Sequence, residues 1–357
     1  MKNKTTKTYN FLTKEQILEI YNMPFMDLVY KAATVHRKYH DSNTVQISTL
    51  ISIKTGGCPE DCAYCPQAAR YHTDIKKNNL MSIEEVRTEA IRAKEEGSSR
   101  ICMGAAWRNV KDGSEFEKVL EMVRTINKLD MEVCCTLGMI TENQAKRLAE
   151  AGLYAYNHNL DSSEDYYKNI ISTRAYQDRL DTIHNIRKTN ITVCSGGIIG
   201  MGESAEDRAA MLAVLCQLQP ASVPINALVP VEGTPMETQK LVSIWEMVRM
   251  ISTARIAIPE TQVRLSAGRK KMSKEGQALC FLAGANSIFA GDKLLTTPNP
   301  DVNEDMEMFK DLGLKPQKPF EKYKQPVTVE AEDSKLKPLG EKPKWSRPGR
   351  KRTGKPR

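Results

Sequence analysis

Three cysteines lie within eight residues of this 357-residue chain, in the segment Cys58-Pro-Glu-Asp-Cys62-Ala-Tyr-Cys65. Thiolates at this spacing can reach one iron–sulfur cluster, and a 4Fe-4S cluster that only transfers electrons takes four cysteine ligands. Because no fourth cysteine lies nearby, one iron would stay open to bind another molecule, which indicates a catalytic site. Zinc is the alternative metal, but structural zinc ligands come as two separated pairs.

The cysteine loop, with Tyr64 just before its last cysteine, resembles that of the radical S-adenosylmethionine enzymes. The resemblance implies that the open iron chelates the amino and carboxylate groups of S-adenosylmethionine. An electron from the cluster would then cleave this cofactor into methionine and a 5′-deoxyadenosyl radical.

Four of the other six cysteines fall in three of the strands that we predict: Cys102, Cys134, Cys135 and Cys194. Since side chains alternate along a strand, at most one of Cys134 and Cys135 faces inward. A single buried cysteine is usually a small hydrophobe. Three cysteines on separate strands, with Arg264 on a fourth, could instead form a second metal site.

Short β-rich runs alternate with helical patterns along the chain, which predicts βα units and a parallel sheet. Strands are expected near Val45–Ile53, Arg100–Gly104, Glu132–Leu137, Tyr154–Leu160, Thr192–Ile198, Ser222–Leu228, Gln262–Leu265 and Ser287–Ala290. Such a series over about 250 residues fits a (β/α)8 TIM-type barrel, an α/β fold. A doubly wound sheet is the alternative, but no Gly-x-Gly-x-x-Gly turn opens a helix after the first strand.

The helices that would cover this barrel also have sequence signals. Capping boxes at Ser82-Ile-Glu-Glu85 and Ser204-Ala-Glu-Asp207 mark two helix starts. Further helices are expected at Lys14–Tyr21, Met26–Tyr39, Ser114–Lys128, Glu142–Ala151, Asp178–Lys188, Thr238–Ile256 and Lys274–Leu282.

The formal net charge of +8 is concentrated at the carboxyl end. Residues 315–357 contain 14 Lys and Arg against 5 Asp and Glu, and 7 of the 17 prolines, a composition that buries too little apolar surface to fold. We therefore expect an N-terminal helical segment at 1–43, the barrel at 44–314 and a disordered Pro/Lys/Arg-rich tail at 315–357. The tail would either keep the protein soluble or contact nucleic acid or another polyanion.

The chain has no run of about 18 apolar residues, and its first residues lack the apolar stretch of a signal peptide. We therefore expect a cytoplasmic protein without a membrane partner. In that reducing compartment, the nine cysteines are expected to be metal ligands or free thiols rather than disulfides.

From about residue 12 to 314, the sequence closely resembles the biotin synthase family. The resemblance lies in the stretches Val45–Leu50, Lys54–Gln67, Cys102–Trp107, Met131–Gly138, Tyr156–Asp161, Val193–Ile198, Val263–Arg269 and Leu294–Pro300. It implies a sulfurtransferase that inserts sulfur into dethiobiotin to form biotin, the last step of biotin biosynthesis. Residues after 314 do not resemble the family.

The resemblance also implies two iron–sulfur clusters with different tasks. A 4Fe-4S cluster that binds S-adenosylmethionine would be held by Cys58, Cys62 and Cys65. A 2Fe-2S cluster that gives up a bridging sulfide would be held by Cys102, Cys134, Cys194 and Arg264. The family likeness thus selects Cys134, rather than Cys135, as the inward ligand.

Polar residues at the ends of strands are assigned by the same resemblance. Those expected to bind S-adenosylmethionine are Tyr64, Asn159, Asp161, Arg179, Gly196, Ile198, Gly200 and Glu203. Arg179 would pair with the methionyl carboxylate, and the glycine-rich turn would contact adenine, although such a turn also suits packing. The residues expected to bind substrate are Lys54, Asn157 and Asn226.

The resemblance further implies an electron donor of the flavodoxin or ferredoxin type, iron–sulfur assembly proteins as partners, and a homodimer. Two other classes stay open on the residues alone. A radical enzyme with another small substrate would not need three strand cysteines and Arg264. An iron–sulfur or RNA-binding protein without catalytic activity would use the cysteines structurally and the basic tail functionally.

Overall fold

The computed structural model describes residues 11–291 and 293–321. The strands at its centre are β1 (Thr44–Lys54), β2 (Arg100–Ala105), β3 (Glu132–Thr136), β4 (Ala155–Asn157), β5 (Thr192–Cys194), β6 (Gly197–Ile199), β7 (Ser222–Ala227), β8 (Gln262–Leu265) and β9 (Ser287–Ala290). They pair in parallel in chain order, β6 joins β7 beyond the end of β5, and β9 pairs with β1. This closure confirms the TIM-type barrel and rules out the doubly wound sheet.

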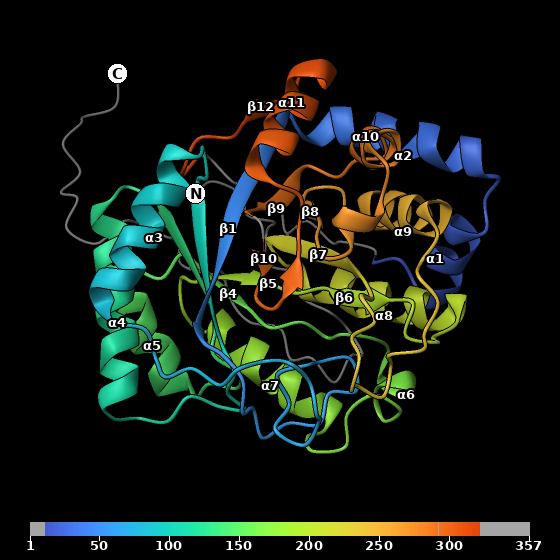
Figure 1. Ribbon diagram of the computed structural model, residues 1–357. Coiled ribbons are helices and arrows are strands. Elements are labelled where there is room, and N and C mark those ends of the chain that lie inside the picture. Colours follow the sequence, from blue (N-terminus) through green and yellow to red (C-terminus); the bar gives the residue numbers. More distant parts are fainter. Residues whose placement is uncertain (1–10, 292, 322–357) are drawn as a thin grey trace, which may run out of the picture.

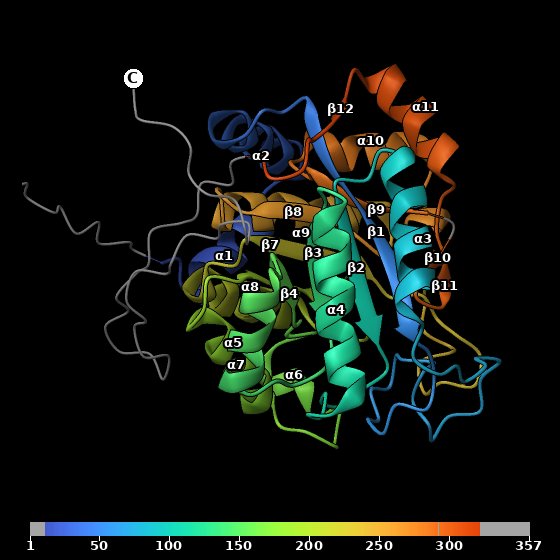
Figure 2. The ribbon, with the colours of Figure 1, turned by 90° about the vertical axis from the view of Figure 1, so that its left-hand side faces the viewer.

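Helices surround the barrel: α1 (Lys14–Tyr21), α2 (Phe25–Tyr39), α3 (Ile83–Glu95), α4 (Ser114–Lys128), α5 (Glu142–Ala151), α6 (Glu164–Tyr167), α7 (Tyr176–Arg187), α8 (Ala205–Leu218), α9 (Ile244–Ala257), α10 (Lys274–Leu282) and α11 (Val302–Leu312). Figure 2 shows α3, α4 and α5 side by side on one flank. The first two helices pack against α8 and α9. Among the residues described, no helix has both the length and the apolar character needed to cross a bilayer.

Both predicted capping boxes are present, each at the start of a helix. The Ser82 and Ser204 side chains accept hydrogen bonds from the third residue of α3 and α8, as capping boxes do. Helix α9 begins at Ile244 rather than Thr238, because Ser243 caps it. Helices α6 and α11 were not predicted. Each has its own side-chain cap, from Ser163 and Asp301 respectively.

The strands separate two apolar regions. The main core lies between the barrel and its helices and includes Cys135. A smaller cluster contains Cys102 and Cys134, together with Phe289 and Leu294. Since neighbouring residues of β3 point to opposite sides of the sheet, Cys134 faces the barrel interior and Cys135 faces the helices.

The first residues of the expected tail pair with the first strand of the barrel. Strand β12 (Lys315–Pro316) lies parallel to the first residues of β1, which extend beyond their partners in β2 and β9. The Lys315 N–H donates to Asn43 O (2.7 Å), and the Gln317 N–H donates to Val45 O (2.8 Å). These free carbonyls give the segment a partner that its composition does not reveal. Residues 322–357, the remainder of the expected tail, lie outside the described ranges.

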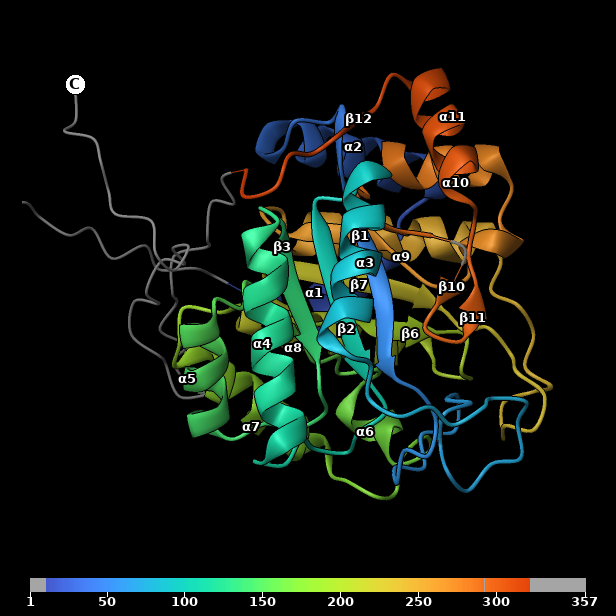
Figure 3. The ribbon, with the colours of Figure 1, turned by 60° about the vertical axis from the view of Figure 1, so that its left-hand side comes forward.

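The two ends of the barrel carry different features. The loop that follows β1, at residues 55–82, lies at one end, and β12 lies at the opposite end (Figures 1 and 3). A short hairpin of β10 (Lys293–Leu294) and β11 (Thr297–Pro298) follows β9. The cysteine loop is therefore at the carboxyl end of the parallel strands, where enzymes of this fold place their active sites.

Candidate active site

The three-cysteine loop leaves the carboxyl end of β1 as a compact turn. The Cys58 N–H donates to Gln67 O, and the Cys65 N–H donates to Cys62 O, each at 2.9 Å. All three thiols are free. Burial, followed by the charges on Cys62 and Cys58, raises the pKa of Cys65 to about 12, so the three sulfurs lie within electrostatic range of one another.

Asp61 fastens this loop to the segment that follows α6. Its carboxylate accepts hydrogen bonds from the Ser172 N–H (3.0 Å) and the Thr173 N–H (3.1 Å). Burial opposes ionisation, but these hydrogen bonds hold the pKa of Asp61 well below its ordinary value. The next residue is Arg174, whose Nη2 lies 4.0 Å from Cys62 Sγ. The segment thus places a positive charge where it would stabilise a thiolate.

Inside the barrel, the predicted second group of cysteines comes together. Cys102 and Cys134 are opposite each other on β2 and β3, and their thiols share a hydrogen bond. Cys194, at the end of β5, accepts hydrogen bonds from Asn157 Nδ2 (3.3 Å) and Arg264 Nη1 (3.9 Å). Burial opposes ionisation of Cys102, but the Cys134 hydrogen bond and the Arg264 charge lower its pKa below the ordinary value of a thiol.

Arg264 is held rigidly beside these thiols. Its side chain is fully buried, and its Nε donates to Ser287 Oγ (2.8 Å) while Nη2 donates to Gln46 Oε1 (3.0 Å). The guanidinium carbon also lies 4.5 Å from the centre of the Phe289 ring. These contacts from β1 and β9 keep one edge of the guanidinium directed toward Cys194.

Polar residues after β4 form a network next to the cysteine loop. Tyr64 Oη donates to Asp161 Oδ2 (2.7 Å), and Arg179 donates to the same carboxylate. Arg179 also donates to Asn159 O through Nη1 (2.5 Å) and to Tyr167 Oη through Nε (2.8 Å). Three nitrogens of Arg179 therefore already donate within the protein, so in this structure the residue positions Asn159 and Asp161.

Glu203 organises the turn that follows β6. Its carboxylate accepts hydrogen bonds from the Gly200 N–H (2.9 Å), the Met201 N–H (2.8 Å) and Arg208 Nε (2.7 Å). Both oxygens of this carboxylate therefore hold the backbone of the turn in place.

The start of this glycine-rich stretch lies against β7. A Cβ atom on Gly196 would be 2.0 Å from Pro224 O, so glycine is required for the close approach. The Gly196 N–H donates to Asn159 Oδ1 (3.2 Å), and the Ile198 N–H donates to Asp161 O (2.9 Å). The turn and the polar network after β4 thus form one continuous surface.

The expected substrate residues occupy two further places on the barrel. Lys54 ends β1, and its Nζ lies 3.7 Å from Glu115 Oε1. Asn226 donates from Nδ2 to Gly197 O (3.0 Å) and accepts at Oδ1 from the Ala267 N–H (3.2 Å). The Asn226 amide thus links β6 to the residues after β8. Lys54, in contrast, pairs with an exposed carboxylate that a ligand carboxylate could replace.

Comparison with known proteins identifies the family. Residues 52–215 match the radical SAM superfamily, and residues 224–315 match the Biotin and Thiamin Synthesis associated domain. Over 341 residues, the chain is 76% identical to biotin synthase from Christiangramia forsetii, and the match covers 95% of this chain and 94% of that protein. Biotin synthase from Flavobacterium psychrophilum is 75% identical over 341 residues, with the same coverage. The chain belongs to the biotin synthase family.

Membership of the biotin synthase family confirms the resemblance seen in the sequence and makes the protein a sulfur-inserting radical enzyme. The radical SAM superfamily match gives it an iron–sulfur cluster and S-adenosylmethionine as cofactors. Solved structures support the fold alone, since their identity is low. Methylornithine synthase has a TM-score of 0.74 at 18% identity, covering 86% of this chain and 95% of that one. A maturase of the [FeFe]-hydrogenase has a TM-score of 0.72 at 18% identity, covering 86% and 72%.

The thiols of this biotin synthase family member are compatible with the iron–sulfur chemistry of the radical SAM superfamily. Within residues 11–291 and 293–321, no three His, Cys, Asp or Glu side chains are grouped as they would be around one metal ion. A cluster keeps its ligands farther apart, because several irons and sulfides lie between them. Both groups contain thiols, which are the usual ligands of iron–sulfur clusters.

Two arginines near the cysteines were not predicted. Arg174 comes close to Cys62 only through the fold, since 112 residues separate them. Arg100 precedes Cys102 by two residues on β2, and its charge contributes to the lowered pKa of that thiol. Strand alternation could have placed Arg100 on the inner face, whereas no local pattern points to Arg174.

Proposed function

We propose that the protein converts dethiobiotin into biotin by radical insertion of sulfur, using two thiol groups in one barrel. The observation that carries this proposal is the inner group itself. Three buried cysteines from β2, β3 and β5 lie with Arg264 inside the barrel, and a separate three-cysteine loop lies at its carboxyl end. A radical enzyme without a sulfur-donating cluster would have no need for the inner group.

We assign the two clusters to these residues. The ligands of a 4Fe-4S cluster are Cys58, Cys62 and Cys65, and those of a 2Fe-2S cluster are Cys102, Cys134, Cys194 and Arg264. When bound, the first cluster and S-adenosylmethionine supply a radical that abstracts hydrogen, and the second cluster supplies the sulfur. The protein's contribution is to hold the target carbons of dethiobiotin between them and to exclude other hydrogen donors.

The polar network beside the loop suits the binding of S-adenosylmethionine. Tyr64, Asn159 and Asp161 present polar atoms next to the loop, and Arg179 fixes two of them in place. We assign the adenine to the surface of the turn, formed by Gly196, Ile198, Gly200 and Glu203. Because Glu203 and Asn159 bind its backbone, this surface is formed before the cofactor arrives.

The substrate lies between the two thiol groups in this proposal. Asn157 suits this place because it already donates to Cys194 of the inner group. Asn226 would meet the ureido ring, and Lys54, at the rim, would meet the carboxylate region after releasing Glu115. The domains are proposed as the helical segment 1–43, the barrel 44–314 and the carboxyl-terminal part 315–357, whose first residues complete the barrel.

This chemistry also indicates which partner proteins and which cell compartment the enzyme needs. Both clusters need iron–sulfur assembly proteins, and the cleavage of S-adenosylmethionine needs an electron donor of the flavodoxin or ferredoxin type. Free thiols in both groups suit the reducing cytoplasm, and we infer a homodimer there.

The test is anaerobic incubation of the reconstituted protein with dethiobiotin, a reductant and S-adenosylmethionine, followed by mass spectrometry. Biotin should form together with 5′-deoxyadenosine. Deoxyadenosine without biotin would indicate a radical enzyme with another substrate. Neither product, from protein with a full complement of iron, would indicate an iron–sulfur protein without catalytic activity.

A further inference from the structure

The amino-terminal end of the barrel is closed by the carboxyl-terminal segment 315–321. Beyond the pairing of β12 with β1, the Phe320 ring meets the Tyr154 ring edge-on at 5.9 Å between centres. Phe320 also packs against the smaller apolar cluster that contains Cys102 and Cys134. The segment therefore contacts the contents of the barrel and not only its rim.

A buried ion pair links this segment to the strands. Arg100 and Glu132 face each other across β2 and β3, with Arg100 Nη2 2.7 Å from Glu132 Oε2. The other oxygen of Glu132 accepts a hydrogen bond from the Phe320 N–H at 2.9 Å. One carboxylate thus holds both the strand arginine and the backbone of the segment.

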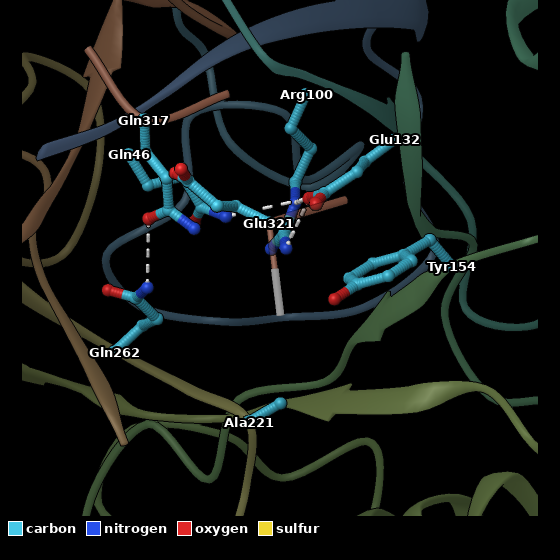
Figure 4. Close-up of a pocket in the computed structure, with 8 residues that line it drawn as sticks. All are labelled: Gln46, Arg100, Glu132, Tyr154, Ala221, Gln262, Gln317 and Glu321. Carbon is cyan, nitrogen blue, oxygen red and sulfur yellow. Dashed lines mark hydrogen bonds and ion pairs between the residues drawn. The ribbon is translucent and has the colours of Figure 1, made fainter. Parts of the chain in front are cut away.

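A small polar cavity lies beneath the segment, as Figure 4 shows. Gln317 and Glu321 of the segment line it together with Gln46 and Gln262, and Gln262 Nε2 donates to Gln317 Oε1 (3.1 Å). Within residues 11–291 and 293–321, Gln262 Oε1 is buried and has no hydrogen-bond partner. The cavity volume of about 10 Å³ is close to the least that one water needs, so the segment leaves almost no free space.

Three residues that line this cavity form a polar layer below the inner group of Cys102, Cys134, Cys194 and Arg264. Each of them precedes a member of that group by two positions on its strand: Arg100 before Cys102, Glu132 before Cys134 and Gln262 before Arg264. Two residues of a strand span roughly 6–7 Å. Among the residues that the structure describes, the layer and the segment therefore lie between the inner thiols and this end of the barrel.

We propose that residues 315–321 form a floor that shuts the amino-terminal end of the barrel and controls the access of small molecules and ions to Cys102 and Cys134. The floor is joined to the strands mainly through its backbone and one aromatic ring, and Lys315, Pro316 and Lys318 are exposed. Such a segment can open while the barrel stays folded. The floor is thus a second entrance, at the opposite end from the cofactor loop.

The consequence for a cluster rests on the proposed function. A cluster that gives up sulfide has to be rebuilt, and S-adenosylmethionine and substrate would occupy the carboxyl end of the barrel. Iron and sulfide could then enter through the opened floor. A closed floor would protect the intact cluster from solvent between turnovers.

The floor can be tested without any cluster. Metal-free, full-length protein is treated anaerobically with N-ethylmaleimide, and labelling of each cysteine is followed by mass spectrometry of peptides. Phe320→Ala, which removes the ring that meets Tyr154, should label Cys102 and Cys134 roughly tenfold faster than the wild type. Lys318→Ala, in the same segment but with an exposed side chain, should label at the wild-type rate.

Cys135 provides the internal reference, because it lies on the other side of β3 in the main core. An increase at Cys135 equal to that at Cys134 would mean general unfolding and would overturn the proposal, as would unchanged rates at Cys102 and Cys134. Gln317→Ala, which removes the bond to Gln262, is the second variant and should show the same selective increase.

A separate measurement addresses the cluster. The measurement uses reconstituted protein exposed to a chelator such as EDTA. Phe320→Ala should lose the absorbance of the inner 2Fe-2S cluster several-fold faster than the wild type does, while the 4Fe-4S cluster of the cysteine loop is lost at the wild-type rate. Equal loss rates would refute a role of the floor in guarding a cluster. If no inner cluster forms in the wild type, the proposed function fails, but the labelling experiment still decides whether the floor exists.

Discussion

Replacing Cys134 or Cys135 by Ala gives two variants that differ only in the face of β3 from which a sulfur is removed. Cys134 lies opposite Cys102 in the barrel interior, whereas Cys135 packs in the main core. We expect Cys134→Ala to lose the 2Fe-2S cluster and biotin formation, because alanine supplies no ligand. Cys135→Ala should keep both.

The two variants should be destabilised to a similar degree. The relative exposure is 1% for Cys134 and 0% for Cys135, so each variant loses one buried group of about methylene size. We expect a decrease of about 1 kcal/mol in the free energy of unfolding of each metal-free variant. Cys134→Ala should lose up to about 1 kcal/mol more, since Cys102 loses its hydrogen-bond partner.

The assay combines visible absorption, iron and sulfide analysis, and urea unfolding of the metal-free proteins. Cys134→Ala should contain two irons and two sulfides fewer per chain than Cys135→Ala, although both unfold at comparable urea concentrations. Equal loss of the inner-cluster absorbance in the two variants would refute the reasoning from strand alternation.

Three further predictions concern other parts of the molecule. Alanine at any cofactor-loop cysteine (Cys58, Cys62 or Cys65) should abolish reductive cleavage of S-adenosylmethionine, and a normal yield of 5′-deoxyadenosine by chromatography would contradict the ligand assignment. Glu203→Ala should lower the free energy of unfolding by about 3 kcal/mol, measured in urea, because it leaves the buried Arg208 without its nearest carboxylate; a loss near zero would mean that the turn does not depend on this pair. Burial, followed by the Arg255 charge, lowers the pKa of His40 from 6.5 to about 4, so the folded protein keeps this ring neutral while the unfolded chain takes up a proton. Stability should therefore be lost as the pH falls from 6.5 to about 4, by up to about 1.4 kcal/mol per pH unit, and His40→Gln should show a shallower decline in urea midpoints; identical slopes would exclude His40 as the cause.

Much of the site was predictable because its residues belong to local patterns. The cysteine loop is a spacing of three residues within one turn. The alternation of side chains along β3 predicts that only one of Cys134 and Cys135 faces inward, and the family resemblance selects Cys134. Their places in two separate apolar clusters agree with this. The positions of the eight predicted barrel strands likewise follow from the periodicity of apolar residues. The pairing of β9 with β1 confirms the closed barrel.

Other features depend on which segments the closed barrel brings together. Arg174 meets Cys62 across 112 residues, and Arg179 donates hydrogen bonds to Asn159 O and to the Asp161 carboxylate. No local spacing predicts such contacts, since they arise from the order of strands around the barrel.

Residues 315–321 show the same limit most clearly. By composition they belong to a basic, proline-rich tail, and composition correctly reports that they bury little apolar surface of their own. They are nevertheless placed by the unpaired start of β1 and by the Glu132 carboxylate, which accepts the Phe320 N–H. The sequence by itself determined the strands and the cysteine groups, because these depend on local periodicity and spacing, and it indicated the family through its resemblance to biotin synthases. Only the tertiary structure decided what closes the barrel beneath the inner thiols, because a backbone donor is satisfied by whichever acceptor the fold brings within reach.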